Sequence, residues 1–215
     1  MERFEHLSMV AFLILGLALV RLMTSCGSLI ARNIIAKEIA EENKLSDGNQ
    51  KNNGNEINKI NSYWVHNILI LMIFFTLIIF WWNAFPLNNL DFMPDNKWNL
   101  FLYFIFLIGP FIFFMLCDVV IPANRDEIQI DLKKYYYRHS KLIIGLTLLL
   151  QISFLINLLV FFQEDITSTK CIGRIILICL MLPIVFSKNE RLHQTIIIIF
   201  FTGFVYTIIK YHIYT

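Results

Sequence analysis

The chain has little of what soluble domains use to turn and to carry charge. Of its 215 residues only eight are glycine and five are proline, and the charged residues together make up 16%. By contrast 57% are hydrophobic, twenty are phenylalanine, and the mean hydropathy is +0.63. A soluble domain of this size does not use so much apolar side chain. The composition therefore predicts an integral membrane protein, with the lipid bilayer as its first partner.

Concentrated charge is also absent. The formal net charge is only +2, and the lysines and arginines are scattered between apolar runs. This excludes a nucleic-acid surface, which needs a basic patch or stripe. The four cysteines form neither a C-x-x-C motif nor a cluster with histidine, so we expect ordinary small apolar side chains, no metal and no cofactor. Catalytic motifs are missing too, so an enzyme has no support from the sequence.

Six apolar stretches are long enough to cross a bilayer core about 30 Å thick, which takes about 20 helical residues. They cover residues 7–30, 63–85, 98–121, 141–162, 170–186 and 193–214. The predicted fold is an all-α membrane bundle of about six transmembrane helices, forming one domain over residues 1–215. The fifth stretch is the weakest, because it is short and carries Arg174 and Pro183. If it were re-entrant, the C-terminus would change sides.

The first stretch has an alternative reading as a cleaved signal. The motif "LMTSCG" loosely resembles the site at which bacterial lipoproteins are cut before a cysteine. However, Glu2 and Glu5 flank the single Arg3, Met23 suits such a site poorly, and Arg21 interrupts the apolar run. A retained first span is the preferred interpretation.

Lysine and arginine near the span ends predict the orientation. The loops after spans one, three and five hold twelve such cations, and the opposite side holds five. The predicted topology is a multi-pass protein of the cell inner membrane with both termini outside the cytoplasm.

Two loops have distinct compositions. Residues 43–60 are rich in Asn, Lys and Gly, which predicts a flexible cytoplasmic loop. Before this loop, "LIARNIIAKEIAEEN" keeps helix formers, so the first helix is expected to extend several turns beyond the membrane. After the third span, "NRDEIQIDLKKYYYRHSK" predicts a short amphipathic interfacial helix. Its Lys133, Lys134 and Arg138 are expected to be interfacial anchors, or with His139 a specific site for anionic lipid.

Polar residues inside spans are the candidate functional residues, because each costs free energy unless it is paired or wet. Arg21 lies near the middle of the first span, and Ser25, Ser28 and Arg32 continue its face. Asp118 lies about one turn inside the end of the third span, at the unfavourable end of the helix dipole, and is the candidate partner of Arg21. The alternatives are that Arg21 reaches the headgroups and that Asp118 is solvated.

The second span contributes a histidine. Tyr63 and Trp81, and likewise Trp64 and Trp82, lie eighteen residues apart. That spacing is five helical turns, about 27 Å, as aromatic belts at two membrane surfaces require. His66 then faces the bundle, and we expect an intramembrane polar cluster of Arg21, His66 and Asp118.

Weaker polar candidates lie elsewhere. They are Ser25, Asn67, Gln151 and Tyr206. Gln151 and Tyr206 fall near mid-membrane, where a hydrogen bond between helices is the usual explanation.

The second span also supports a family resemblance. "YWVH" opens this span, "FWW" closes it, "GP" lies in the middle of the next, and "YYYRHSK" follows. In these features the chain resembles a family of uncharacterised bacterial multi-span membrane proteins, over about the first 160 residues. The matching positions are Tyr63, Trp64, His66, Trp81, Trp82, Pro110 and Tyr137. In size and character it is also similar to small multi-span accessory proteins encoded beside bacterial antiviral nucleases.

Two hypotheses for function follow. The first is a non-enzymatic membrane accessory or sensor protein that binds another protein or a second copy of itself, in bacterial defence or in the envelope. The second is an oligomeric channel or small-solute transporter whose polar cluster lines a cytoplasmic vestibule. The sequence favours the first, because transporters usually carry broken helices in two repeated halves, and no internal repeat is visible.

Overall fold

The computed structural model is all-helical over the residues it describes, which are 3–46, 62–84, 99–122 and 131–210. Six helices follow one another along the chain: α1 (Arg3–Ser46), α2 (Trp64–Ala84), α3 (Leu100–Val120), α4 (Leu132–Val160), α5 (Thr169–Phe186) and α6 (Glu190–Ile208). Each is long and apolar enough to cross a membrane. The predicted number of long apolar helices is confirmed, and the weak fifth stretch forms a helix of 18 residues.

Side-chain caps fix where four of the helices begin. Asn99, Asp131, Ser168 and Asn189 each accept a hydrogen bond from a backbone N–H in the first turn of α3, α4, α5 and α6. Such caps satisfy donors that a helix start leaves without a partner.

The cap at Asp131 corrects the prediction of a separate interfacial helix. The stretch from Leu132 onward forms the first turns of α4, which continues unbroken to Val160. No proline or glycine interrupts residues 132–144, so nothing in the sequence ends a helix there. Residues 123–130, which include the first part of the predicted interfacial helix, lie outside the described residues.

Helix α1 is the longest element, with 44 residues. Its extension past the predicted span is confirmed, and it includes residues 43–46, which were expected to belong to a flexible loop. The helix formers of this stretch explain the continuation. The rest of that loop, residues 47–60, lies outside the described residues.

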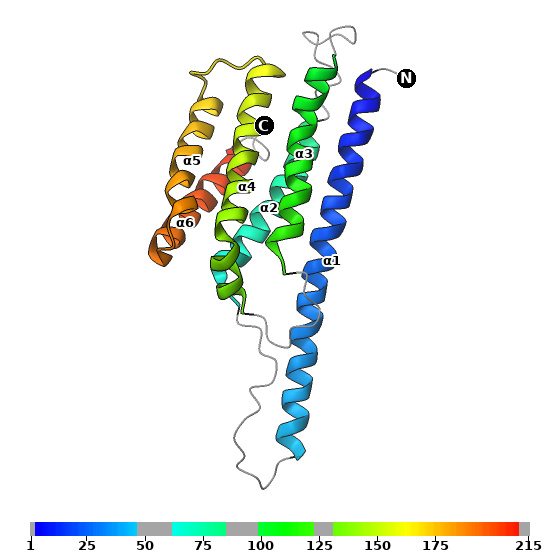
Figure 1. The fold of residues 1–215 in the computed structure, drawn as a ribbon, viewed down its shortest axis with the longest axis vertical. Coiled ribbons are helices and arrows are strands. Elements are labelled where there is room, and N and C mark those ends of the chain that lie inside the picture. Colours follow the sequence, from blue (N-terminus) through cyan, green and yellow to red (C-terminus); the bar gives the residue numbers. More distant parts are fainter. Residues whose placement is uncertain (1–2, 47–61, 85–98, 123–130, 211–215) are drawn as a thin grey trace.

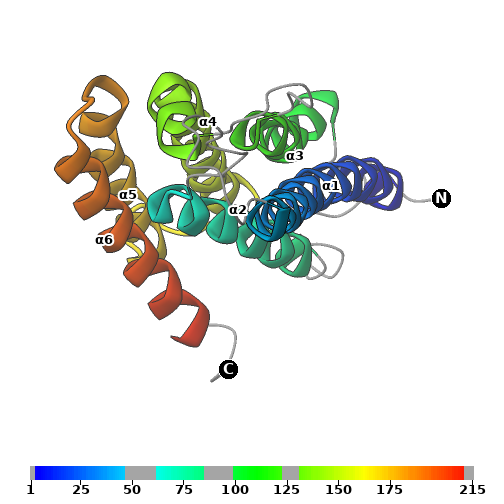
Figure 2. The same ribbon diagram turned by 90° about the horizontal axis from the view of Figure 1, so that it is seen from below.

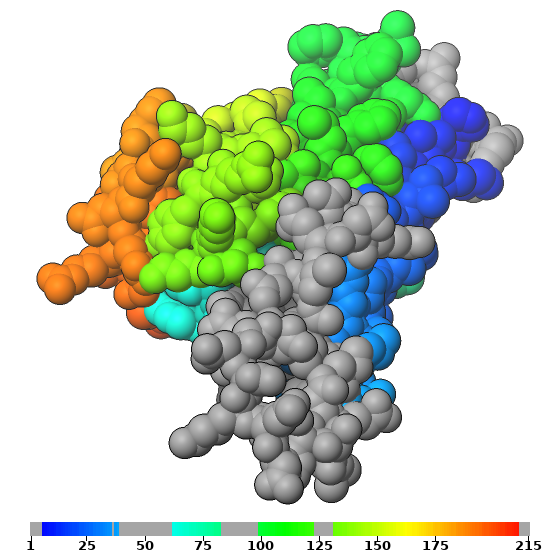
Figure 3. All heavy atoms as spheres, turned by 60° about the horizontal axis from the view of Figure 1, so that its bottom comes forward, coloured from blue at the N-terminus to red at the C-terminus, as the bar shows by residue number. Residues whose placement is uncertain are grey.

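The helices pack in an irregular bundle. Figure 1 shows α1 beside α3, with the lower half of α1 reaching well below the other helices. Figure 2 shows the bundle from below, with α1 and α3 together, α4 beside α3, and α5 and α6 on the opposite side. In the space-filling view of Figure 3, α3, α4 and α5 form one side of the molecule. The main core has members from all six helices and includes Leu22, Phe113, Leu116, Ile143 and Ile144.

The aromatic anchors of α2 behave as predicted in part. Trp64, Trp81 and Trp82 are exposed on the bundle surface, whereas His66 is fully buried, so the predicted inward face of His66 is confirmed. Tyr63 was expected to share the lipid-facing role of Trp81, but it is buried. The reason is that Tyr63 precedes α2 and turns toward α4, where its hydroxyl lies 2.9 Å from that of Tyr137.

Candidate functional site

Helices α1 and α3 run parallel with one constant offset. The His6 Nδ1 atom lies 3.4 Å from the Tyr103 hydroxyl, and Arg21 contacts Asp118 further along; both pairs are 97 residues apart in sequence. Because the offset is unchanged over 15 residues, about 22 Å of helix, the two helices stay level with one another. The end of α3 at Val120 is therefore level with Met23, and residues 24–46 of α1 lie beyond it.

The predicted contact between Arg21 and Asp118 is present in the structure. Arg21 Nε donates to Asp118 Oδ1 at 2.7 Å, joining α1 to α3. The two side chains are 43% and 50% exposed, so the pair lies on the flank of the bundle. The pair sits near the end of α3, lower than the expected position of Arg21, which was near the middle of its span and slightly toward this end. Next to it, Leu22 is the last buried residue among the described side chains of α1.

The polar face that continues from Arg21 runs along the part of α1 beyond α3. Ser25 and Arg32 are half-buried, and the Ser28 hydroxyl donates to the carbonyl of Ser25 within the helix. This face therefore starts at the ion pair and follows the helix out of the bundle.

The third member of the predicted cluster lies in a different neighbourhood. His66 is enclosed by the rings of Tyr135 and Tyr136, with centroids 6.1 and 6.0 Å away. Neither of its ring nitrogens makes a hydrogen bond of good geometry to the described residues, although the Val120 carbonyl lies close. Its link to Asp118 is indirect, because the Tyr135 hydroxyl donates to the carbonyl of Val119.

A tyrosine–histidine cluster, which sequence reasoning missed, surrounds His66 at the same end of the bundle. It consists of Tyr63, His66, Tyr135, Tyr136, Tyr137 and His193. The Tyr136 hydroxyl and His193 Nδ1 are 2.9 Å apart, and His193 Nε2 lies 2.8 Å from the Ser187 carbonyl oxygen. A carbonyl can only accept, so Nε2 carries the proton and Nδ1 accepts from Tyr136. The cluster thus ties α4 to α6, and the "YYY" run was its only signal in the sequence.

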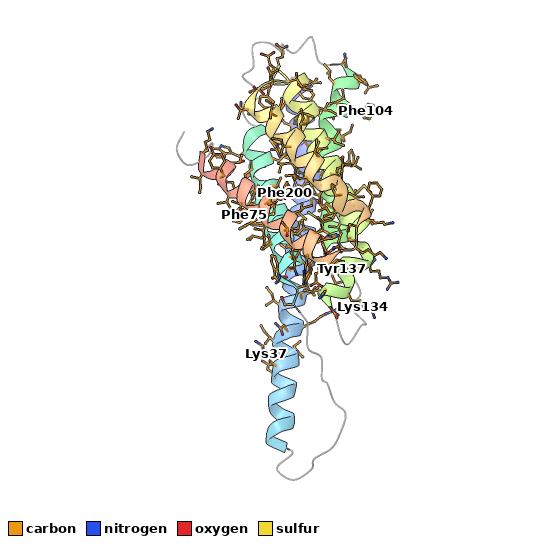
Figure 4. All side chains as sticks on the ribbon, turned by 90° about the vertical axis from the view of Figure 1, so that its left-hand side faces the viewer. Lys37, Phe75, Phe104, Lys134, Tyr137 and Phe200 are labelled. Carbon is orange, nitrogen blue, oxygen red and sulfur yellow. The ribbon has the colours of Figure 1, made fainter. Side chains whose placement is uncertain are left out.

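The cations of α4 are near this cluster. Lys133, Lys134 and Arg138 are exposed, and their role as anchors at a membrane surface stays a prediction. Figure 4 shows Lys134 and Tyr137 together at the lower end of α4. Lys133 also forms an ion pair of 2.8 Å with Glu190 at the start of α6.

A second polar contact lies between α4 and α5. Arg174 Nη1 donates to Gln151 Oε1, so the predicted interhelical hydrogen bond of Gln151 is confirmed. The guanidinium also lies 5.0 Å from the centroid of the Phe154 ring. Sequence reasoning had treated Arg174 only as a charge near a span end. The signal that could have found it was a single arginine five residues inside an apolar helix.

The other polar candidates have smaller roles. Asn67 donates to the Ser62 hydroxyl at 2.8 Å, just before α2. Tyr206 is 60% exposed and lies under the Lys210 ammonium at 5.7 Å, and no hydrogen bond to another described helix is present, contrary to expectation. Its side chain is on the exposed side of α6. Over the described ranges no group of three metal-ligating side chains comes together.

The comparisons with known proteins gave no match to a family model, a curated protein or a solved structure. The family resemblance carried by "YWVH" and "FWW" therefore stays a prediction, and any functional argument has to come from the geometry.

Proposed function

We propose that this protein is a membrane-embedded accessory protein that presents the far half of α1 as a binding arm for another protein. The arm is residues 24–46, the part of α1 beyond the end of α3. In this proposal α3, with about 31 Å of helix, matches the hydrocarbon core of the bilayer.

The length of α1 is the observation that carries the proposal. The arm adds about 34 Å of continuous helix past the level of Val120. Figure 4 shows Lys37 on this section, clear of the other described helices. A helix needs only about 20 residues to span a bilayer, so a function confined to the membrane would not require the second half of α1.

The side chains of the arm suit contact with protein. Ile30, Ile34 and Ile35 are 62%, 52% and 53% exposed. A helix destined only for water would be polar around its circumference, whereas exposed apolar residues rimmed by polar ones mark an interaction surface.

The ion pair between Arg21 and Asp118 is placed to control the arm. It fastens α1 to α3 at the level where α1 loses its last buried side chain. If a partner pulls or tilts the arm, the ion pair between Arg21 and Asp118 is the first contact to be strained. The proposed role of the pair is therefore to couple the arm to the bundle, which is the sensor hypothesis in structural terms.

The proposed topology places the arm in the cytoplasm. The excess of lysine and arginine on the loops after spans one, three and five favours that side. A cysteine introduced at Lys37 should then react with a membrane-impermeant maleimide only after the cells are opened. Labelling in intact cells would reverse the orientation but leave the arm.

Photo-crosslinking tests the arm directly. A photoreactive amino acid at Ile34 should give a protein adduct of defined mass in native membranes. The same amino acid at Phe104, an exposed position on the outer face of α3, is the matched control and should give lipid adducts. The double variant Ile30→Asn/Ile34→Asn should abolish the protein adduct when the probe stands at Lys37. Lipid adducts alone at Ile34 would contradict the proposal.

A further inference from the structure

Arg174 is a charged residue of α5 that plays no part in the proposed binding arm. Its Nη1 donates to Gln151 Oε1, and its guanidinium lies over the Phe154 ring, so both contacts hold it against α4. A guanidinium has five N–H donors, and among the described residues only this one hydrogen bond is formed.

The height of Arg174 in the bundle follows from its neighbours. Phe154 lies against Phe113 of α3, with ring centroids 6.0 Å apart. One residue earlier on α4, the Ser153 hydroxyl oxygen lies 3.3 Å from the position that a Cβ on Gly109 would take. Gly109 and Phe113 are in the middle of α3. The guanidinium, held at Gln151 and Phe154, is therefore level with the middle of α3.

No carboxylate among the described residues pairs with Arg174. The carboxylates that do form ion pairs are committed to other cations: Asp118 to Arg21, Glu190 to Lys133, and Glu164 to Lys170. Glu164 is the acid nearest in sequence to α5, and the hydrogen bond from Lys170 holds its pKa below the ordinary value. Arg174 thus has one neutral acceptor and one aromatic face for a full positive charge.

Such a charge is costly in a bilayer unless an anion compensates it. Gln151 and Phe154 occupy one edge and one face of the guanidinium, and the remaining N–H groups keep the fork geometry that suits oxyanions. Arg174 as a whole residue is only partly buried, at the boundary between α4 and α5, so an anion has to enter between these two helices to reach the guanidinium. The start of α5, five residues away, adds positive potential of the same sign.

We propose that Arg174 and Gln151 form an oxyanion-binding site between α4 and α5, which takes a phosphate or carboxylate group. Gln151 orients the guanidinium, Phe154 supports it, and the ligand supplies the missing negative charge. The group can come from an acidic phospholipid of the surrounding bilayer or from a small soluble anion, and the test separates these sources. The site does not depend on the arm of α1.

The decisive variant is Gln151→Glu. It keeps the size of the side chain and every cation, but it gives Arg174 an internal carboxylate. The bound anion then becomes redundant. Arg174→Gln removes the charge instead, and Lys188→Gln, at an exposed position between α5 and α6, is the control.

The experiment uses the full chain in nanodiscs, in two arms. In the first, radiolabelled inorganic phosphate is titrated onto protein in neutral phosphatidylcholine. In the second, native mass spectrometry counts phosphatidylglycerol retained from mixed nanodiscs. Wild type and Lys188→Gln should bind in at least one arm, and Gln151→Glu and Arg174→Gln should lose that binding at least tenfold. Binding in the first arm identifies a soluble anion, and binding in the second alone identifies a lipid.

The thermal midpoint provides an independent measurement. In neutral lipid without added anion, Gln151→Glu should melt above wild type, because it compensates the charge from within. This variant decides the matter even if Arg174→Gln does not fold. Absence of anion binding in both arms, or binding that Gln151→Glu leaves unchanged, would overturn the proposal.

Discussion

Two arginines within the apolar helices of this bundle have their positive charges compensated in opposite ways. Arg21 lies on the flank between α1 and α3, half exposed, with a carboxylate at 2.7 Å. Arg174 lies between α4 and α5, level with the middle of the bundle, with an amide and an aromatic ring as partners. The first charge is neutralised by the fold itself, whereas the second is left for something else to neutralise.

The difference separates coupling from binding. An ion pair complete within the chain can hold two helices at a chosen level and can yield under load, because an exposed pair contributes little to stability. An incomplete charge holds its helices less well but attracts an anion from outside. The α1–α3 contact therefore suits a mechanical role, and the α4–α5 contact suits ligand binding.

The largest expected effect on the free energy of unfolding comes from replacing Phe154, the aromatic residue that contacts the Arg174 guanidinium. Phe154→Ala removes a ring that stacks on Phe80 at 5.6 Å and contacts Phe113, so unfolding should become easier by about 3 kcal/mol. Denaturant titration of the full chain in detergent measures this. Phe104→Ala, at an exposed position, should change it by less than about 0.5 kcal/mol. Equal effects at both positions would show that the packing of Phe154 against Phe80 and Phe113 does not stabilise the protein.

A smaller effect is expected where α3 and α4 approach closely. A side chain on Gly109 meets the Ser153 hydroxyl and the Phe80 ring at 3.3 and 3.5 Å. Gly109→Val should therefore destabilise the protein by about 1–3 kcal/mol through overpacking.

Gly145 provides the matched control for that measurement. An added Cβ at Gly145 meets nothing within 4 Å, so Gly145→Ala should be neutral or stabilise α4 by about 0.5–1 kcal/mol. If Gly109→Val were tolerated as well, α4 would not approach α3 closely at Gly109. The argument that places Arg174 level with the middle of α3 would then lose one of its two supports.

The ion pair between Arg21 and Asp118 should matter less for stability than for position. Arg21→Gln or Asp118→Asn should change the unfolding free energy by at most about 1 kcal/mol. In either variant, however, spin labels at positions 37 and 141 should show a broader distance distribution than in wild type. Pulsed electron paramagnetic resonance measures this distribution, which broadens because the arm is no longer fastened to α3.

The charge swap tests this role of the pair. Arg21→Asp combined with Asp118→Arg should restore a narrow distance distribution, since the same contact can form with the signs exchanged. A distribution that stays narrow in both single variants would mean that packing at Leu22, not the ion pair, holds the arm.

The sequence predicted the helices and the contact between Arg21 and Asp118, because both follow from local quantities. Span length comes from hydropathy, and the contact from the depth of two charges in helices of like direction. It could not predict the heights correctly, because the level of Arg21 depends on the offset between α1 and α3. The same limit applied to Arg174, whose height is set by how α4 crosses α3 at Gly109. The tyrosine–histidine cluster was missed because three helices, α2, α4 and α6, have to converge to form it.

The smallest expected effect on stability is that of replacing His66, and it tests whether His66 belongs to the same site as Arg21 and Asp118. Its ring is fully buried but forms no hydrogen bond of good geometry to the described residues. Replacing it by an apolar residue of similar size therefore breaks no hydrogen bond of good geometry, and His66→Leu should change stability by less than about 0.5 kcal/mol. His193→Leu is the matched control, since it loses the bonds to Tyr136 and to the Ser187 carbonyl and should cost about 2 kcal/mol. If both substitutions cost the same, His66 has a polar partner, and the Val120 carbonyl, which lies close to the ring, is the first candidate.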